Sequence, residues 1–326
     1  MTEVTMIQAI NQALKIAMKN DKDVILMGED IGVNGGVFRA TEGLLKEFGE
    51  ERVIDTPLSE NGIVGMAIGM ALYGLKPVAE IQFQDFIFSA YDQIVSEAAK
   101  YRYRSGGQFP CHVVIRAPYG GGIKGGLYHS QSNEQLFTSI PGLKVAIPST
   151  PADAMGLLLT AITHEEDPVM FFEPKRLYRT SVGEIPQGGQ PIPFGKARVV
   201  KEGSDVSVFA YGAMVPQSMQ AVNMVEKTGI HAELIDLRTL APMDVEAVVS
   251  SVEKTGRAVI VHEAPMFCGY GAELSATIAE KALYSLKAPV LRVTGYDTPF
   301  PYALENLYLP SVDRIARGIE RTATAV

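Results

Sequence analysis

Short apolar runs alternate with helical patterns along nearly the whole chain, and this rhythm constrains the fold more than any other feature. From residue 6 to residue 18, apolar side chains recur at the spacing of one helix face. The run from Asp23 to Met27 is instead short, continuous and closed by Gly28, as in a buried strand. Strands that alternate with helices predict a parallel sheet covered on both faces. Comparable strand-like runs occupy residues 52–55, 78–83, 113–116, 144–147, 169–172, 206–211, 232–236, 258–262 and 289–293.

The rhythm breaks once, between about residues 174 and 204, where prolines and glycines crowd together. Such a segment is typical of a link between domains. The chain has 326 residues, which exceeds the size at which single domains usually divide. We therefore predict an α/β protein with two doubly wound domains. The first would span residues 1–180, the linker residues 181–203 and the second domain residues 204–326.

Composition narrows the classes of function. The formal net charge of −8 argues against the basic face that nucleic acids require. Two cysteines, Cys111 and Cys268, make no disulfide framework. No apolar run is long enough to cross a membrane, and the first residues show neither a signal-peptide nor a transit-peptide pattern. We expect a cytoplasmic protein that binds neither membranes nor nucleic acid.

The segment from Asp55 to Gly65 reads Asp-Thr-Pro-Leu-Ser-Glu-Asn-Gly-Ile-Val-Gly and lies between a predicted strand and a predicted helix. Ligands of open α/β sheets bind at such positions. Glu60 would stand near the start of the helix, where a carboxylate complements the helix dipole by about 0.3–1 kcal/mol. Position alone therefore favours a structural role for Glu60.

The predicted helix over residues 61–73 strengthens the case for a functional role. It is apolar on nearly every side, so it must be buried on every side. Gly65 and Gly69 would let another backbone approach closely. This favours a helix at a subunit interface, although a helix in the core of one large domain has the same pattern. Burial there would favour the protonated form of Glu60 and make it a proton partner for a ring nitrogen.

A second motif, Glu80-Ile-Gln-Phe-Gln-Asp-Phe86, follows a predicted strand and precedes a helix predicted near residues 88–103. It would place Gln82, Asp85 and Phe86 near the carboxyl edge of the sheet. Taken alone, the motif is more simply interpreted as a strand end with an aromatic side chain filling the core.

A third motif, from Ala117 to Ser132, holds five glycines and then His129. Glycines after a strand allow backbone shapes that are closed to other residues. The segment lacks the Gly-Lys-Ser/Thr of a phosphate-binding loop. We interpret it as a mobile loop that delivers His129, whose imidazole can exchange protons near neutral pH.

The three motifs together resemble those of beta subunits of 2-oxo acid dehydrogenase complexes, in the thiamine-diphosphate-dependent decarboxylase component. The resemblance covers essentially the whole chain. It implies a transketolase-like architecture, with a pyrimidine-binding domain followed by a transketolase C-terminal domain. Further stretches that look like the same family are residues 41–44, 102–108, 172–175, 236–240 and 294–302.

The resemblance also implies roles for individual residues. Glu60 would hydrogen-bond the aminopyrimidine ring of thiamine diphosphate, and Leu58 would offer a backbone carbonyl to the amino group of that ring. Gln82 and Phe86 match positions that line the ring pocket, and Phe86 replaces the tyrosine expected there. His129 would act near the reacting centre during acyl transfer to a lipoyl group, supported by its neighbours Ser130 and Gln131.

Partners and ions follow from the same resemblance. An alpha subunit would supply the magnesium and diphosphate site, whose Gly-Asp-Gly signature this chain lacks. Two alpha and two beta chains would form a heterotetramer that docks on a lipoyl acyltransferase core. A structural potassium ion would be held near Cys111, Val113, Val114, Ala161 and Asp167.

The substrate implied is a small 2-oxo acid. The stretches at residues 128–132 and 172–178 lean toward the branched-chain enzymes, while pyruvate and acetoin dehydrogenases remain alternatives. A rival enzyme class is the coenzyme A transferases, because Ser59-Glu-Asn-Gly-Ile-Val-Gly matches the core of their nucleophilic glutamate motif. That family does not account for the other two motifs. A silent scaffold is the non-enzymatic alternative, and the presence of both Glu60 and His129 argues against it.

Overall fold

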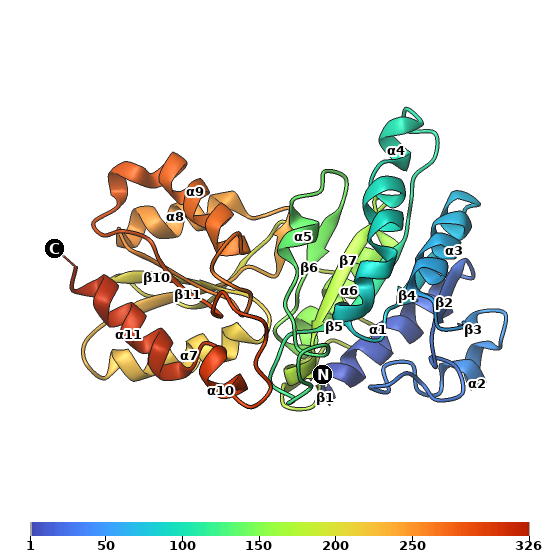
Figure 1. Cartoon of the computed structure of the whole chain (residues 1–326), viewed down its shortest axis with the longest axis horizontal. Helices are drawn as coiled ribbons and strands as arrows, with labels where there is room; N and C mark the ends of the chain where they lie inside the picture. Colours follow the sequence, from blue (N-terminus) through green and yellow to red (C-terminus); the bar gives the residue numbers. More distant parts are fainter. Residues whose placement is uncertain (1, 326) are drawn as a thin grey trace. The chain divides into compact units, whose positions relative to one another are not determined.

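The computed structural model describes residues 2–325, and the chain divides into two compact units (Figure 1). The first unit comprises Met1–Tyr119 and Leu136–Phe194, and the second comprises Gly120–Gln135 and Gly195–Val326. The glycine-rich segment that carries His129 therefore leaves the first unit and makes its contacts within the second.

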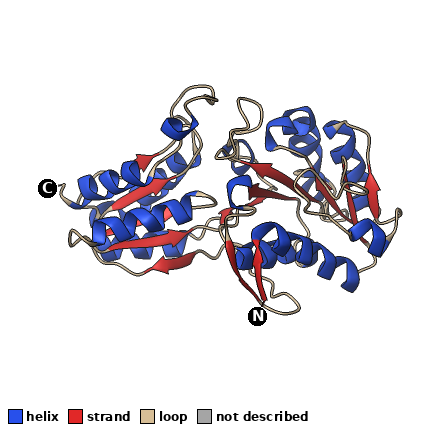
Figure 2. Ribbon diagram, turned by 90° about the horizontal axis from the view of Figure 1, so that it is seen from below, coloured by secondary structure: helices blue, strands red, loops and turns tan. Residues whose placement is uncertain are grey.

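The first unit is built on parallel strands that run in the order β6-β7-β5-β4-β2-β3. Most of their residues are buried, as expected where helices cover both faces of a parallel sheet (Figure 2). The register pairs Gly28 with both Asp55 and Glu80, so β2, β3 and β4 end at one level. The strands are β2 (Val24–Gly28), β3 (Val53–Asp55), β4 (Lys76–Glu80), β5 (Val114–Tyr119), β6 (Lys144–Ala146) and β7 (Val169–Pro174).

The helices of the first unit begin where the sequence provides caps. The Thr5 side chain caps α1 (Met6–Asn20), with Gln8 completing a capping box, and Thr150 caps α6 (Pro151–Thr163). The other α-helices that start before residue 140 are α2 (Leu44–Phe48), α3 (Glu60–Leu72), α4 (Tyr101–Arg104) and α5 (Gln135–Thr138). Among the helices of residues 2–325, none combines the length and the apolar character needed to cross a membrane.

The helix predicted near residues 88–103 is wrong as a single helix. The chain instead forms a 3-10 helix at Gln84–Ala90, a π-helix at Gln93–Ala98 and then the short α4. A change in helical pitch alters the direction in which side chains point, and such departures are frequent at functional sites. Ser89, in the 3-10 helix, reaches the carboxylate of Glu60.

The second unit holds a five-stranded sheet in the order β14-β13-β10-β11-β9. Four of these strands are parallel, but β9 runs antiparallel to β11, so the expectation of parallel strands fails at this edge. The strands are β9 (Arg198–Lys201), β10 (Val206–Ala210), β11 (Ala232–Asp236), β13 (Ala258–Val261) and β14 (Leu291–Val293), with β12 (Thr239–Ala241) outside this sheet. The helices are α7 (Met214–Glu226), α8 (Val245–Thr255), α9 (Tyr270–Ala282), α10 (Glu305–Tyr308) and α11 (Val312–Ala323), with a 3-10 turn at Leu283–Ser285.

The predicted linker, residues 181–203, contains two strands. Its first part forms β8 (Val182–Ile185), which pairs antiparallel with β1 (Thr2–Thr5), and its last part includes β9. The irregular stretch between them packs closely against α6. The N–H of Ile192 donates to the carbonyl of Gly156, and a Cβ on Gly156 would stand 2.5 Å from the Ile192 side chain. The connection is thus a packed segment of the first unit as far as Phe194.

Candidate functional site

Three neighbouring parallel strands of the first unit deliver polar side chains to one edge of the sheet. Glu29 directly follows β2, Glu60 follows β3, and Gln82 follows β4. Because β2 lies between the other two strands, the residues after all three meet at the same edge. The sequence predicted this location for Glu60 and Gln82.

Glu60 is the first residue of α3, as predicted. The Ser59 side chain caps the helix by accepting a hydrogen bond from the N–H of Gly62. Glu60 is half-buried, and the hydroxyl of Ser89 donates to its Oε2 at 2.9 Å. The carboxylate is thereby tied to two elements, the N-terminus of α3 and the 3-10 helix that follows β4.

Glu29 and Asp30 belong to the same cluster, although the sequence analysis did not identify them as site residues. Burial raises the pKa of Glu29, and the nearby carboxylates of Asp30 and Glu60 raise it further. Asp30 adopts a left-handed φ of +58° and accepts a hydrogen bond from Gln82 Nε2 at 3.4 Å. An edge where several carboxylates repel one another is suited to holding a proton between them.

An aromatic row continues from this cluster. The ring of Phe86 lies edge-on to that of Phe83, with centroids 5.6 Å apart, and Phe83 packs edge-on against Phe38 at 5.4 Å. Phe86 is half-buried. Leu58, whose carbonyl was predicted to face a ring, is 71% exposed. The predicted ring-lining residues thus border the carboxylate cluster and keep apolar surface open.

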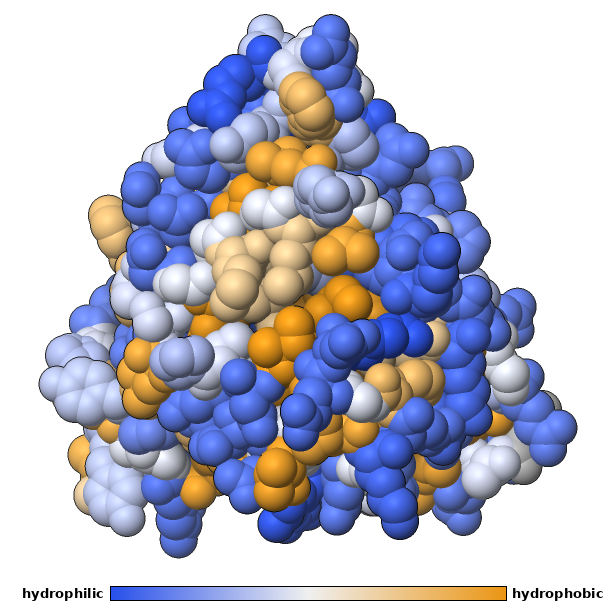
Figure 3. All heavy atoms as spheres, turned by 90° about the vertical axis from the view of Figure 1, so that its right-hand side faces the viewer, coloured by the Kyte–Doolittle hydropathy of each residue, from blue (hydrophilic) through white to orange (hydrophobic). Residues whose placement is uncertain are grey.

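The outer face of α3 is apolar and uncovered. Met66 is 44% exposed and Tyr73, directly after the helix, is 90% exposed. A Cβ at Gly69 would meet nothing within 4 Å, so packing within this chain does not require a glycine there. Figure 3 looks onto the side of the molecule that carries α3 and shows apolar surface gathered on it. Large exposed apolar patches mark interaction sites, which supports the predicted interface helix.

His129 lies in the loop of the second unit, so the two predicted catalytic residues belong to different units. Ser130 is buried, and a Cβ on Gly125 would stand 2.8 Å from the Cβ and the carbonyl oxygen of His129. Gln131 Nε2 donates to the carbonyl of Leu127 at 3.3 Å. Gln131 therefore shapes the backbone on the N-terminal side of His129.

Two of the backbone carbonyls expected to hold potassium already accept hydrogen bonds. The carbonyl of Cys111 accepts the N–H of Val113, and the carbonyl of Val113 accepts the N–H of Val169, both at 2.9 Å. Burial raises the pKa of the Cys111 thiol to about 12, so its sulfur stays protonated. Val114 lies in β5 and Ala161 in α6.

Asp167, the one carboxylate of that expected set, is paired with cations. Its Oδ1 lies 3.0 Å from Arg102 Nη1, and its Oδ2 lies 3.7 Å from Lys144 Nζ. Within residues 2–325, no group of three or more histidine, cysteine, aspartate or glutamate side chains is arranged to hold a metal ion.

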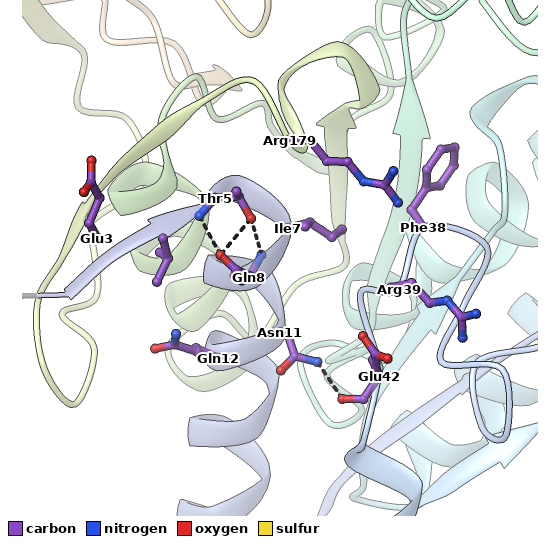
Figure 4. A pocket seen from close by; sticks show the side chains of 11 residues that line it. Glu3, Thr5, Ile7, Gln8, Asn11, Gln12, Phe38, Arg39, Glu42 and Arg179 are labelled. Atoms are coloured by element: carbon purple, nitrogen blue, oxygen red, sulfur yellow. Dashed lines mark hydrogen bonds between the residues drawn. The ribbon is translucent and has the colours of Figure 1, made fainter.

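A cavity of about 540 Å³ opens beside the start of α1 (Figure 4). Two of its polar side chains serve the fold: Gln8 completes the cap of α1, and Asn11 Nδ2 donates to the carbonyl of Glu42 at 3.1 Å. Phe38 lines it and connects it to the far end of the aromatic row. None of the predicted site residues lines this cavity, so we assign the site to the edge of the sheet.

Two family models match the chain. The transketolase pyrimidine-binding domain matches residues 2–181, and the transketolase C-terminal domain matches residues 195–315. A 2-oxoisovalerate dehydrogenase beta subunit from Dictyostelium discoideum is 56% identical over 322 residues, which cover 98% of this chain and 86% of that protein. The chain belongs to the beta subunits of 2-oxo acid dehydrogenases. The predicted family and the two-domain transketolase-like fold are thereby confirmed.

Other relatives of this beta subunit carry a different substrate in their names. Pyruvate dehydrogenase E1 component beta subunits are 51% identical in Bacillus subtilis and 50% identical in Staphylococcus aureus, and they cover 95% and 99% of this chain and 96% and 99% of their own lengths. A solved split-gene transketolase, described as an inactive beta4 tetramer, superposes with a TM-score of 0.82 at 23% identity and 99% coverage of both chains. That likeness shows the fold.

The assignment also decides between the enzyme classes considered from the sequence. Transketolase domains over both halves account for all three motifs. A coenzyme A transferase would account only for the glutamate motif around Glu60. Enzymes of this family depend on thiamine diphosphate.

Proposed function

We propose that this beta subunit, together with an alpha subunit, decarboxylates a branched-chain 2-oxo acid and passes the acyl group to a lipoyl group of an acyltransferase core. The observation that carries the proposal is the position of the Glu60 carboxylate at the sheet edge formed by β2, β3 and β4. It accepts a hydrogen bond from the hydroxyl of Ser89 and lies near the carboxylate of Glu29. Higher identity to the 2-oxoisovalerate enzyme, 56% against 50–51% for the pyruvate enzymes, favours a branched substrate.

The residues present fit one side of a thiamine diphosphate site. A carboxylate in a partly buried acidic cluster can share a proton with a ring nitrogen, and an adjacent aromatic row offers a surface for a flat ring. Glu60, Leu58, Gln82 and Phe86 would hold the aminopyrimidine side. When bound, the cofactor supplies the electron sink for decarboxylation. Glu60 would hold the proton at its carboxylate, and Ser89 would fix the direction of that carboxylate.

The alpha subunit would supply the magnesium and diphosphate side and cover the apolar face of α3. On that face Met66 exposes apolar surface and Gly69 leaves room for the backbone of a partner helix. This supports a heterotetramer of two alpha and two beta chains. Covering α3 would also remove water from Glu60, at the start of the same helix.

Potassium is the component that the contacts support least, because an ion at Asp167 would compete with Arg102 and Lys144. Potassium titration of the assembled enzyme, followed by thermal denaturation, tests it. We also propose that the protein is cytoplasmic. The Dictyostelium relative is named mitochondrial, so fractionation of the source cells tests the location.

The role of Glu60 is tested by Glu60→Gln in the enzyme reconstituted with its alpha subunit. The amide keeps the size of the side chain but cannot hold the proton, so decarboxylation with a dye acceptor should fall by several orders of magnitude while assembly is unchanged. Glu51→Gln, at an exposed position before β3, is the matched control. Near-full decarboxylation by the Glu60 variant would overturn the assignment.

The substrate is tested with the same reconstituted enzyme. The ratio kcat/KM should be higher for 2-oxoisovalerate than for pyruvate. Each methylene that fits an apolar pocket contributes about 1–3 kcal/mol to discrimination, or about 10- to 200-fold. A preference for pyruvate would make the chain a pyruvate dehydrogenase beta subunit and leave the role of Glu60 intact.

A further inference from the structure

The loop that carries His129 is closed at its neck. The N–H of Gly120 donates to the carbonyl of Gln131 at 2.9 Å, which brings the two ends of the loop together. Gly120 has a φ of +83°, in the left-handed region that favours glycine. Any group that holds both sides of this neck therefore holds the whole loop.

Glu263 contacts both sides of the neck. Its Oε2 accepts the N–H of Gly121 at 2.9 Å on one side and the hydroxyl of Ser132 at 3.5 Å on the other. Glu263 is 5% exposed and lies just beyond the carboxyl end of β13. A Cβ on Gly120 would stand 2.7 Å from the same oxygen, so the neck lies directly on the carboxylate.

A second anchor follows the neck. The hydroxyl of Tyr211 donates to Oε1 of Glu134 at 2.6 Å, and Glu134 is fully buried. The Tyr211 ring is itself held, because it stacks on His262 at 6.2 Å and meets Tyr270 edge-on at 6.0 Å. Tyr211 follows β10 and His262 follows β13, which are adjacent parallel strands. The anchor thus rests on the carboxyl edge of the second sheet.

The tip of the loop has its own contact. The N–H of Lys124 donates to the carboxylate of Glu305, at 3.3 and 3.2 Å from its two oxygens, and Glu305 is buried at the start of α10. Lys124 has a left-handed φ of +56°. The loop is consequently held at its neck, at its tip and beyond its second end, and His129 lies between these points.

We propose that Glu263 and the Tyr211–Glu134 pair are positioning residues that fix the loop and so set where His129 stands. The proposal rests on the proposed function of the enzyme and on the role in acyl transfer that the family resemblance implies for His129. It goes beyond that function by assigning these three residues of the second unit a part in the reaction, although none of them needs to touch the substrate. A displacement of about 1 Å in a reacting group can lower a rate about 100-fold.

The test uses Glu263→Ala and Tyr211→Phe in the enzyme reconstituted with its alpha subunit, with a lipoylated domain as acyl acceptor. We expect acyl transfer to fall at least tenfold in Glu263→Ala, while dye-linked decarboxylation stays within twofold of wild type. Glu263→Gln should recover most of the transfer, since its carbonyl oxygen still accepts the N–H of Gly121. Glu253→Ala, an exposed glutamate of α8, is the matched control.

Hydrogen–deuterium exchange of the peptides covering residues 120–135 is the second measurement. Exchange should be faster in Glu263→Ala and also in Tyr211→Phe. The second variant is the milder change because it keeps the stacked ring, so it provides the test if Glu263→Ala fails to assemble. Unchanged acyl transfer together with unchanged exchange in Tyr211→Phe would overturn the proposal. His129→Ala is run in parallel: if it transfers acyl groups at the wild-type rate, the role of His129 fails, and the exchange data still decide whether these residues fix the loop.

Discussion

The hydroxyl of Ser89 donates a hydrogen bond of 2.9 Å to Oε2 of Glu60. The two residues come from different elements, since Glu60 starts α3 and Ser89 lies in the 3-10 helix after β4. A carboxylate with one oxygen fixed in this way leaves the other oxygen free to face a ligand. The hydrogen bond therefore orients the group on which the proposed chemistry depends.

Ser89→Ala removes that donor without removing a buried side chain, because Ser89 is exposed in this chain. A single hydrogen bond contributes about 1 kcal/mol, so decarboxylation by the reconstituted enzyme should fall about fivefold. Ser89→Thr keeps the hydroxyl and should stay within twofold. Equal rates for the alanine variant and wild type would show that Ser89 does not orient Glu60.

Gly69→Leu separates the folding of the chain from its assembly. A side chain at this exposed position of α3 meets nothing within 4 Å in this chain, and replacing glycine within a helix removes a penalty of about 1 kcal/mol. The isolated chain should therefore melt at the wild-type temperature or above it. Association with the alpha subunit, measured by size-exclusion chromatography, should be lost because the leucine occupies the space of the partner backbone.

Ala279→Leu provides the matched control for that prediction. Ala279 is an exposed residue of α9, so the variant adds the same side chain to a helix of the second unit. It should assemble normally. Normal assembly of Gly69→Leu as well would place the alpha subunit elsewhere.

Local periodicity accounts for the parts of the first unit that were predicted correctly. The continuous apolar run before Gly28 is a strand whose residues are all buried, and the helix predicted over residues 61–73 is α3. Ser59 and Glu60 stand at the N-terminus of that helix because a serine cap and an acidic first turn both favour a helix start. These features depend on residues that are near one another in the chain.

Contacts between distant residues account for what the sequence did not reveal. Glu29 joins the site only because β2 lies beside β3 and β4. The contact between Gly121 and Glu263 joins residues 142 positions apart, so the passage of the glycine-rich loop into the second unit left no local signal. The antiparallel direction of β9 likewise depends on pairing with β11 rather than on its own residues.

Stability should depend on pH through Glu134. Burial raises the pKa of its carboxyl to about 7 in the folded chain, from an ordinary value of 4.5, and repulsion by Glu263 adds to the effect while the hydrogen bond from Tyr211 opposes it. The folded state therefore holds the proton more tightly than the unfolded state does. The stabilisation from the protonated carboxyl of Glu134 is complete below about pH 4.5 and is lost as the pH rises to about 7.

His262 acts in the opposite direction in nearly the same pH range. Burial lowers the pKa of its imidazole to about 4, so folding is destabilised as the pH falls from 6.5. Comparison of wild type with Glu134→Gln cancels this effect, since both keep His262. The glutamine variant should be about as stable as wild type at pH 4.5 and more stable by about 3 kcal/mol above pH 7. A constant difference in stability between the two proteins at all pH values would show that folding does not raise the pKa of the Glu134 carboxyl.

The core of the first unit depends on a buried ionic cluster. Arg116 Nε and Nη2 donate to the two carboxylate oxygens of Glu173 at 2.7 and 2.9 Å, and Nη1 donates to Glu80 at 2.7 Å. All three side chains are buried, and the hydroxyl of Tyr178 also donates to Glu173. Burial raises the pKa of Glu80 despite the adjacent guanidinium. The carboxylate of Glu80 therefore depends on Arg116 to remain charged.

Arg116→Met should destabilise the first unit by about 3–5 kcal/mol, because it leaves two buried carboxylates without their cation. The loss should be smaller at pH 5 than at pH 8, since acid allows Glu80, whose pKa is raised by burial, to take up a proton. Adding Glu173→Gln to the variant should recover part of the stability. Arg104→Met, which breaks an exposed pair with Glu97 and a contact with the ring of Tyr101, should leave the melting temperature nearly unchanged. Equal melting temperatures of Arg116→Met and Arg104→Met, measured by calorimetry, would mean that the stability of the first unit does not depend on this cluster.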